Sequence, residues 1–209
     1  MTEFYVGVDL AQAQDYTAVA ILKTITPGKK YHLVHLDRFQ KTYTDTVRLL
    51  KALMQRDPLR RSGVLIADAT GVGRPIIDML RGEGLRPISV LIHGGVNTTQ
   101  DPETKFWHVP KVDLVSTLDA ALQTPADVEP MLQIAAGLSL ADVLVSELQN
   151  FRAKPTPNGH MTYAAREGQH DDLLLAVSLA LWWAKKRAVD FSILNLSAKN
   201  LIGQGSRLR

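Results

Sequence analysis

The amino-acid sequence predicts an α/β protein with one mixed β-sheet and helices on both of its faces. Near the N-terminus, three strand-like segments follow one another with short links, which is typical of an antiparallel meander. Further along, short apolar strands alternate with amphipathic helices, which is typical of parallel strands joined by helical crossovers. The two patterns together indicate an antiparallel part and a parallel part of the same sheet.

The three N-terminal strands are expected at residues 4–11, 17–24 and 31–39. In the first of them, apolar side chains occupy every second position from Phe4 to Leu10, and alternate residues of a strand share a face. Turn-forming residues that include a Pro-Gly pair separate the second strand from the third.

The later elements follow from the spacing of apolar residues, which distinguishes helices from short buried strands. In chain order we expect a helix at 44–56, a strand at 63–67, a helix from a Thr-Gly-Val-Gly loop to about 81, a strand at 86–92, a polar loop at 94–104, helices at 111–123 and 139–151, a turn at 155–159 between two short strands, and a helix at 170–187. The sequence therefore predicts one domain over residues 1–187 and a basic tail over residues 188–209.

Composition restricts the classes of function. With 209 residues and 45% hydrophobic residues, the chain can bury a full core. Its formal net charge of +3 permits a nucleic-acid partner without requiring one. The absence of cysteine excludes disulfides and thiolate metal sites. We expect a cytoplasmic protein without a membrane segment, because no signal peptide is recognisable and the apolar run 173–184 is too short to span a bilayer.

Asp9 is the first residue that points to chemistry. Aspartate is depleted in strands, yet Asp9 lies in an otherwise apolar one, on the face that also carries Gly7 and Ala11. We interpret these small neighbours as open space beside the carboxylate, which a metal and a phosphate would need. An edge-strand aspartate that faces water is the ordinary alternative.

Further acids follow a strand and open a helix. Asp68 comes at the carboxyl end of the short apolar strand, the edge where ligand sites of open α/β sheets gather. Asp171 and Asp172 start the last helix, where one acidic residue is explained by capping but a second is not. Carboxylates brought within about 4–6 Å raise each other's pKa, and a divalent cation removes that penalty. Oxygen ligands suit Mg²⁺ or Mn²⁺, and two such ions support phosphodiester cleavage.

Five short motifs carry a resemblance to a known family. They are Val6-Gly-Val-Asp-Leu-Ala11 with Asp15-Tyr-Thr-Ala18 following, Ala67-Asp-Ala-Thr-Gly-Val-Gly73, Val109-Pro-Lys111 before a helix, Ser146-Glu-Leu148 before a hairpin, and Gly168-Gln-His-Asp-Asp-Leu173 before an alanine-rich helix. In their order and spacing over residues 4–187, they resemble the nuclease domain of tailed-phage terminase large subunits.

The resemblance implies a ribonuclease H-like fold and a metal-dependent endonuclease that cuts double-stranded viral DNA during genome packaging. Carried over by position, Asp9, Asp68, Asp171 and Asp172 would be the catalytic metal-binding acids, and Mg²⁺ or Mn²⁺ the cofactor in a two-metal site. The choice between Asp171 and Asp172 as the main ligand stays open.

Other inferences concern DNA and protein partners. Lys154 and Arg166 flank a turn that could contact DNA phosphates, and Lys111 could do the same, although exposed basic residues are common at turns and in first helical turns. Terminase large subunits also contain an ATPase motor, whereas this sequence has no phosphate-binding G-x-x-x-x-G-K-[ST] loop. We therefore expect a separate or excised packaging ATPase and a portal as partners, in the host-cell cytoplasm.

Three other readings compete with a terminase nuclease. A Holliday-junction resolvase shares the fold and the acids and would act as a dimer on branched DNA. A degenerate nuclease that serves as a DNA or portal adaptor would keep the fold without the activity. An actin-like ATP site also uses a first-strand Gly-x-Asp, but it normally needs two such domains, for which this chain is too short.

Overall fold

The computed structural model describes residues 2–11, 15–26, 30–71, 73–123, 128–155, 161–164 and 170–204. Between residues 152 and 164, and beyond residue 190, only the backbone is described.

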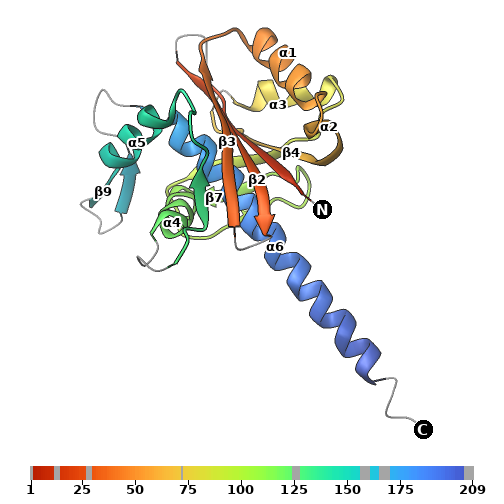
Figure 1. Ribbon diagram of the computed structural model, residues 1–209. Coiled ribbons are helices and arrows are strands. Elements are labelled where there is room, and N and C mark those ends of the chain that lie inside the picture. Colours follow the sequence, from red (N-terminus) through yellow and green to blue (C-terminus); the bar gives the residue numbers. More distant parts are fainter. Residues whose placement is uncertain are drawn as a thin grey trace.

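One mixed sheet of eight strands forms the centre of this described part (Figure 1). Its strands are β1 (Phe4–Asp9), β2 (Thr17–Thr26), β3 (Lys30–Phe39), β4 (Gly63–Asp68), β5 (Ile88–His93), β6 (Thr99–Gln100), β7 (Trp107–Pro110) and β8 (Leu132–Ile134), in the order β6-β7-β5-β4-β1-β2-β3-β8. Strands β1, β2 and β3 are antiparallel, and β1, β4, β5 and β7 run parallel. The predicted mixed sheet is confirmed, with β6, β7 and β8 as additions that the sequence pattern did not indicate.

Helices cover both faces of the sheet, as predicted. They are α1 (Tyr43–Met54), α2 (Leu59–Ser62), α3 (Gly73–Gly82), α4 (Lys111–Leu122), α5 (Ala141–Asn150) and α6 (Asp172–Gln204), and a separate hairpin is formed by β9 (Arg152–Pro155) and β10 (Met161–Ala164). Alternate residues of β1 divide the core: Val6 and Val8 pack with α1–α3, whereas Tyr5 packs with α4–α6. The molecule is thus a three-layer α/β/α structure.

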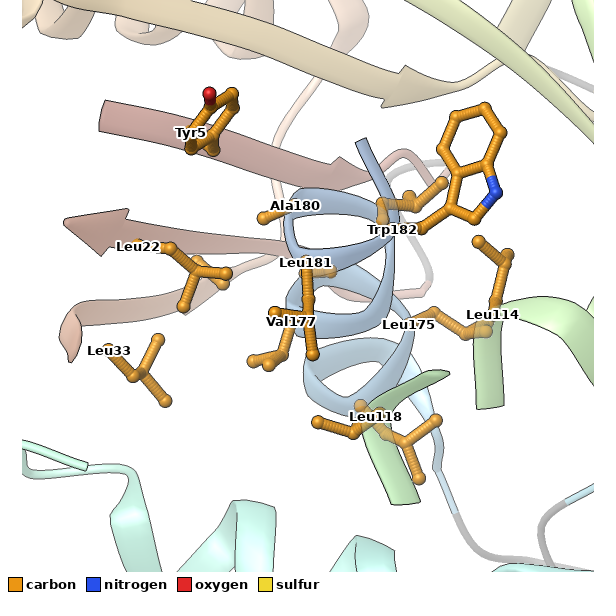
Figure 2. Close-up of a cluster of buried hydrophobic side chains, with 14 of the residues drawn as sticks. Tyr5, Leu22, Leu33, Leu114, Leu118, Leu175, Val177, Ala180, Leu181 and Trp182 are labelled. Carbon is orange, nitrogen blue, oxygen red and sulfur yellow. The ribbon is translucent and has the colours of Figure 1, made fainter. Parts of the chain in front are cut away.

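Helix α6 is the central helix of its layer. Figure 2 shows it beside the strands, with Leu175 toward Leu114 of α4 and Ala180 toward the sheet. It begins close to the predicted position but continues to Gln204, well beyond residue 187, and its C-terminal part extends away from the body (Figure 1). None of the described helices combines the length and apolar character needed to cross a membrane.

Candidate metal-binding active site

The sheet places two aspartates side by side. Strands β1 and β4 are parallel, with Val8 paired to Ala67, and the same register continued by one residue brings Asp9 beside Asp68. Both residues end their strands, so both carboxylates lie at the carboxyl edge of the parallel part of the sheet. This is the edge where α/β proteins build ligand sites.

Helix α6 brings the other two aspartates to the same edge. A cavity of about 230 Å³ opens there, and its wall includes residues of β1, of the segment after it and of the start of α6. The lining residues are Asp9, Ala11, Asp15, Tyr16, His170, Asp171 and Asp172. Three of the four predicted acids therefore share one cavity, and Asp68 lies in the strand next to Asp9.

Gly7, two residues before Asp9, has a different role from the one we expected. A Cβ on Gly7 would lie 2.9 Å from the backbone nitrogen of Ala180 and closer still to the carbonyl oxygen of Ala176. Helix α6 thus fills the space at Gly7, and the interpretation of that space as room for a metal was wrong. The glycine allows the backbones of β1 and α6 to touch, which brings the start of α6 toward Asp9.

Burial and mutual repulsion disfavour the charged forms of these acids. Burial raises the pKa of Asp9 well above its usual value, and the neighbouring Asp68, Asp171 and Asp172 raise it further. Burial also raises the pKa of Asp68, against the hydrogen bonds that the hydroxyl and backbone N–H of Thr70 donate to it. The aspartates therefore interact through space, which is the situation that a bound cation relieves.

Lys111 supplies a positive charge inside this acidic group. Its Nζ lies 2.7 Å from Oδ2 of Asp171, and its charge lowers the pKa of both Asp9 and Asp68. The side chain is only 24% exposed, so Lys111 is neither a simple surface residue nor free to contact DNA in this arrangement. The ion pair could not be predicted from local sequence patterns, because its partners are 60 positions apart.

Asp172 differs from Asp171 in its surroundings. Nη2 of Arg38 lies 3.0 Å from Oδ2 of Asp172, and Nη1 lies 3.8 Å from Oε1 of Glu147. Burial raises the pKa of Asp172, and it raises the pKa of Glu147 to about 7. The two adjacent aspartates are thus held by two different cations, Lys111 for one and Arg38 for the other.

The chemistry of these donors fits a hard divalent cation. All four acids offer carboxylate oxygens, which Mg²⁺ and Mn²⁺ prefer. Among the described residues, however, no three acidic or histidine side chains stand close enough together to form a finished metal-binding group. Oδ1 of Asp172 is buried and receives no hydrogen bond from any described residue, so one carboxylate oxygen is without a donor.

Three further residues line the cavity, and the sequence analysis had placed them in motifs without assigning them to the site. Asp15 and Tyr16 reach it from the segment after β1, and His170 reaches it from the segment before α6. The ring of His170 stands edge-on to that of Tyr16, with 5.5 Å between the centroids. Of the predicted DNA contacts, Lys154 lies in β9 with its side chain outside the described residues, and Arg166 lies wholly outside them.

One relative in sequence is a phage protein. The chain is 27% identical over 178 residues to the terminase large subunit of Thermus virus P23-45. The match covers 85% of this chain but 31% of the phage protein, so the chain spans about a third of that relative. No protein-family model matches the chain.

Solved structures with the same fold come from several phages. The large terminase nuclease of the thermophilic phage G20c superposes with a TM-score of 0.62 at 23% identity, over 86% of this chain and 81% of that one. The nuclease domain of the large terminase subunit of bacterial virus Sf6 gives a TM-score of 0.58 at 15% identity, over 86% and 87% of the two chains. The resemblance indicated by the motifs is confirmed, and the chain has the ribonuclease H-like fold of the phage large terminase nuclease domains.

Proposed function

We propose that this chain is a metal-dependent endonuclease that hydrolyses phosphodiester bonds of double-stranded DNA in phage genome packaging. The observation that carries the proposal is the meeting of Asp9, Asp171 and Asp172 at one cavity, with Asp68 beside Asp9. Fewer carboxylates at this edge of the sheet would serve any structural purpose equally well. A cation site, by contrast, needs several carboxylate ligands. The likeness to terminase nucleases supports the same activity.

The residues would divide the work as follows. Asp9, Asp68 and Asp171 would supply carboxylate oxygens for divalent cations, with Asp172 beside them. Bound Mg²⁺ or Mn²⁺, as a pair, would activate water and stabilise the leaving oxygen. Structures of the phage G20c nuclease contain bound magnesium or cobalt, which supports a divalent cofactor for this chain.

DNA would approach the cavity from the edge of the sheet. We keep Lys154 and Arg166 as candidate phosphate contacts, because basic residues near a cleavage site position the backbone of the duplex. Lys111 would reach a phosphate only after leaving Asp171, which we expect when cations take over the charge of the acids. A packaging ATPase and a portal are the proposed protein partners, and the host-cell cytoplasm the proposed location.

Plasmid cleavage tests the function. Purified wild-type protein is incubated with supercoiled plasmid and Mn²⁺, Mg²⁺ or EDTA, next to Asp68→Asn and the control Asp78→Asn, an exposed aspartate of α3. We expect nicking and linearisation by wild type and control only with metal, and a rate at least about 100-fold lower for Asp68→Asn, since even indirect metal-site substitutions cost about 10- to 100-fold.

Two results would oppose the proposal in different ways. Equal cleavage by Asp68→Asn and wild type would assign the activity to a contaminant or another site. If none of the proteins cuts, calorimetric titration with Mn²⁺ decides: no binding rejects a metal enzyme and favours the degenerate adaptor, whereas binding without cleavage is the result expected of a nuclease that needs a partner to position the DNA.

A further inference from the structure

The clearest unexplained feature beside the cavity is a buried arginine. Arg38 lies in β3, where it pairs across the sheet with Ala18, and Ala18 pairs in turn with Asp9. Directly paired residues of neighbouring strands point to the same face. Arg38 therefore belongs to the same row and face as Asp9, about 10 Å away at a strand spacing of about 4.8 Å. Its side chain is only 13% exposed.

The guanidinium connects two buried acids from two helices. It lies 3.0 Å from Asp172 at the start of α6 and 3.8 Å from Glu147 of α5. Glu147 in turn accepts a hydrogen bond of 2.9 Å from the backbone N–H of Leu174, in the first turn of α6. One arginine of the sheet thus holds the side chain of Asp172 and also lies beside Glu147, which bonds the backbone of the first turn of α6.

The geometry suits a guanidinium. Its planar fork can face two carboxylates at once, which the single ammonium of a lysine does less well. The ring of Tyr16 covers the guanidinium, with 4.0 Å from Cζ to the ring centroid, and Tyr16 also lines the cavity. The arginine is therefore enclosed between its acids and one wall of the site.

The contacts also divide the two oxygens of Asp172. Oδ2 is engaged by Arg38, whereas Oδ1 is buried and receives no hydrogen bond from the described residues. Asp171, by contrast, pairs with Lys111 on the other side of the acidic group. Since a buried oxygen without a donor is costly, Oδ1 is the atom of this pair that most needs a ligand.

We propose that Arg38 is a positioning residue of the active site: it holds Oδ2 of Asp172 and so presents Oδ1 to the cation. This inference rests on the proposed function, because it assigns a partner to one of the proposed metal-binding acids. Arg38 itself touches neither DNA nor the reacting atoms. Its loss should therefore weaken metal binding and lower kcat, while KM for DNA changes little.

The test compares Arg38→Lys and Arg38→Met with wild type and with Arg48→Lys, which alters an exposed arginine paired with Asp45 on α1. Three quantities are measured for each protein: Tm without metal, Kd for Mn²⁺ alone by calorimetry, and kcat and KM for plasmid cleavage. Arg38→Met leaves two buried acids without their cation and can fail to fold. Arg38→Lys keeps the positive charge, so it tests the proposal if Arg38→Met does not fold.

We expect Arg38→Lys to fold and to bind Mn²⁺ about 10-fold more weakly, in the range found when partners of metal ligands are changed. Its kcat should fall by a similar factor and its KM should stay within about twofold of wild type, while Arg48→Lys matches wild type throughout. Unchanged Mn²⁺ affinity in folded Arg38→Lys would overturn the positioning role, as would an Arg38→Lys protein that does not fold. If wild type neither binds Mn²⁺ nor cuts DNA, the proposed function itself fails.

Discussion

In this protein, the pKa of a carboxyl group depends more on its surroundings than on whether it belongs to aspartate or glutamate. Burial is the largest cause of the raised pKa of both Asp9 and Glu147, but the cations near the two carboxyl groups differ. Lys111 favours the charged form of Asp9, and Arg38 favours that of Glu147. The free energy of unfolding without metal should therefore depend on pH, and single substitutions can show which carboxyl group causes that dependence.

Glu147 gives the sharpest test of that dependence. Its pKa is raised from 4.5 to about 7, so the folded chain holds a proton that the unfolded chain has already released. The free energy of unfolding should accordingly fall as pH rises from about 4.5 to about 7, by up to about 3 kcal/mol. Glu147→Gln should remove this part of the slope and be the more stable protein at pH 8.

Urea unfolding of both proteins between pH 4 and pH 8, without metal, measures the slope. Glu83→Gln is the matched control, because Glu83 is exposed, pairs with Lys51 and has a lowered pKa. Glu83→Gln should not change how the free energy of unfolding depends on pH over this range. Parallel wild-type and Glu147→Gln curves would show that Glu147 titrates normally.

Residue patterns predicted part of the acidic group that the fold assembles at the cavity. Asp9 and Asp68 were recognisable because aspartate is unusual within or directly after a buried strand, and Asp171 and Asp172 because a cap needs only one acid. Arg38 and Glu147 were not, since a strand arginine and a helix glutamate are ordinarily exposed, and only the folded chain brings residues 38, 147 and 172 together.

At the scale of elements, the long strands and helices and the short hairpin strands β9 and β10 were predictable, whereas the short strands β6, β7 and β8 were not. Strands β1 to β3 contain six to ten residues, enough for alternation to be visible, whereas β6, β7 and β8 contain two to four. Such short strands exist because a neighbouring strand offers hydrogen bonds, which no local pattern reveals. The role of Gly7 was misread for a related reason: its neighbour in space is α6.

The contact between β1 and α6 leads to a prediction for Gly7→Ala. The new methyl group would collide with the backbone of α6 at Ala176 and Ala180, and backbone atoms cannot turn aside as side chains do. We expect a loss of about 3 kcal/mol or more in the free energy of unfolding, at the upper end of overpacking effects. Denaturant unfolding at constant pH measures it.

Gly82→Ala is the matched control for this prediction. Apart from its own helical turn, no described residue has an atom within 4 Å of the position that a Cβ at Gly82 would take, and Gly82 belongs to α3, where alanine is the better helix former. It should be neutral or stabilising by up to about 1 kcal/mol. A Gly7→Ala protein as stable as Gly82→Ala would mean that α6 does not approach β1 so closely in solution.

For the molecule as a whole, cation binding should stabilise the fold. The acids repel one another in the metal-free state, and a ligand that binds only the folded chain raises its stability. At 100 times Kd the gain is about 2.7 kcal/mol, or roughly 5 to 10 °C in Tm for a domain of this size. Differential scanning fluorimetry with and without Mn²⁺ measures the shift.

Asp9→Asn separates this effect from general salt effects. The substitution removes a buried acid whose charged form is disfavoured, so the metal-free protein should be at least as stable as wild type at pH 8. It should also lose the increase in Tm with Mn²⁺, whereas Asp78→Asn keeps it. An equal increase in all three proteins would place the stabilising cation elsewhere.

The length and direction of α6 determine what can be attached to this domain. Its 33 residues form a rod of about 50 Å, with Asp172 in its first turn and the other end away from the body (Figure 1). A fluorescent dye, a surface tether or another polypeptide joined at that far end would leave the entrance to the acids open to a DNA duplex. The helix thus offers a handle for holding the domain at the end that lies farthest from the acids.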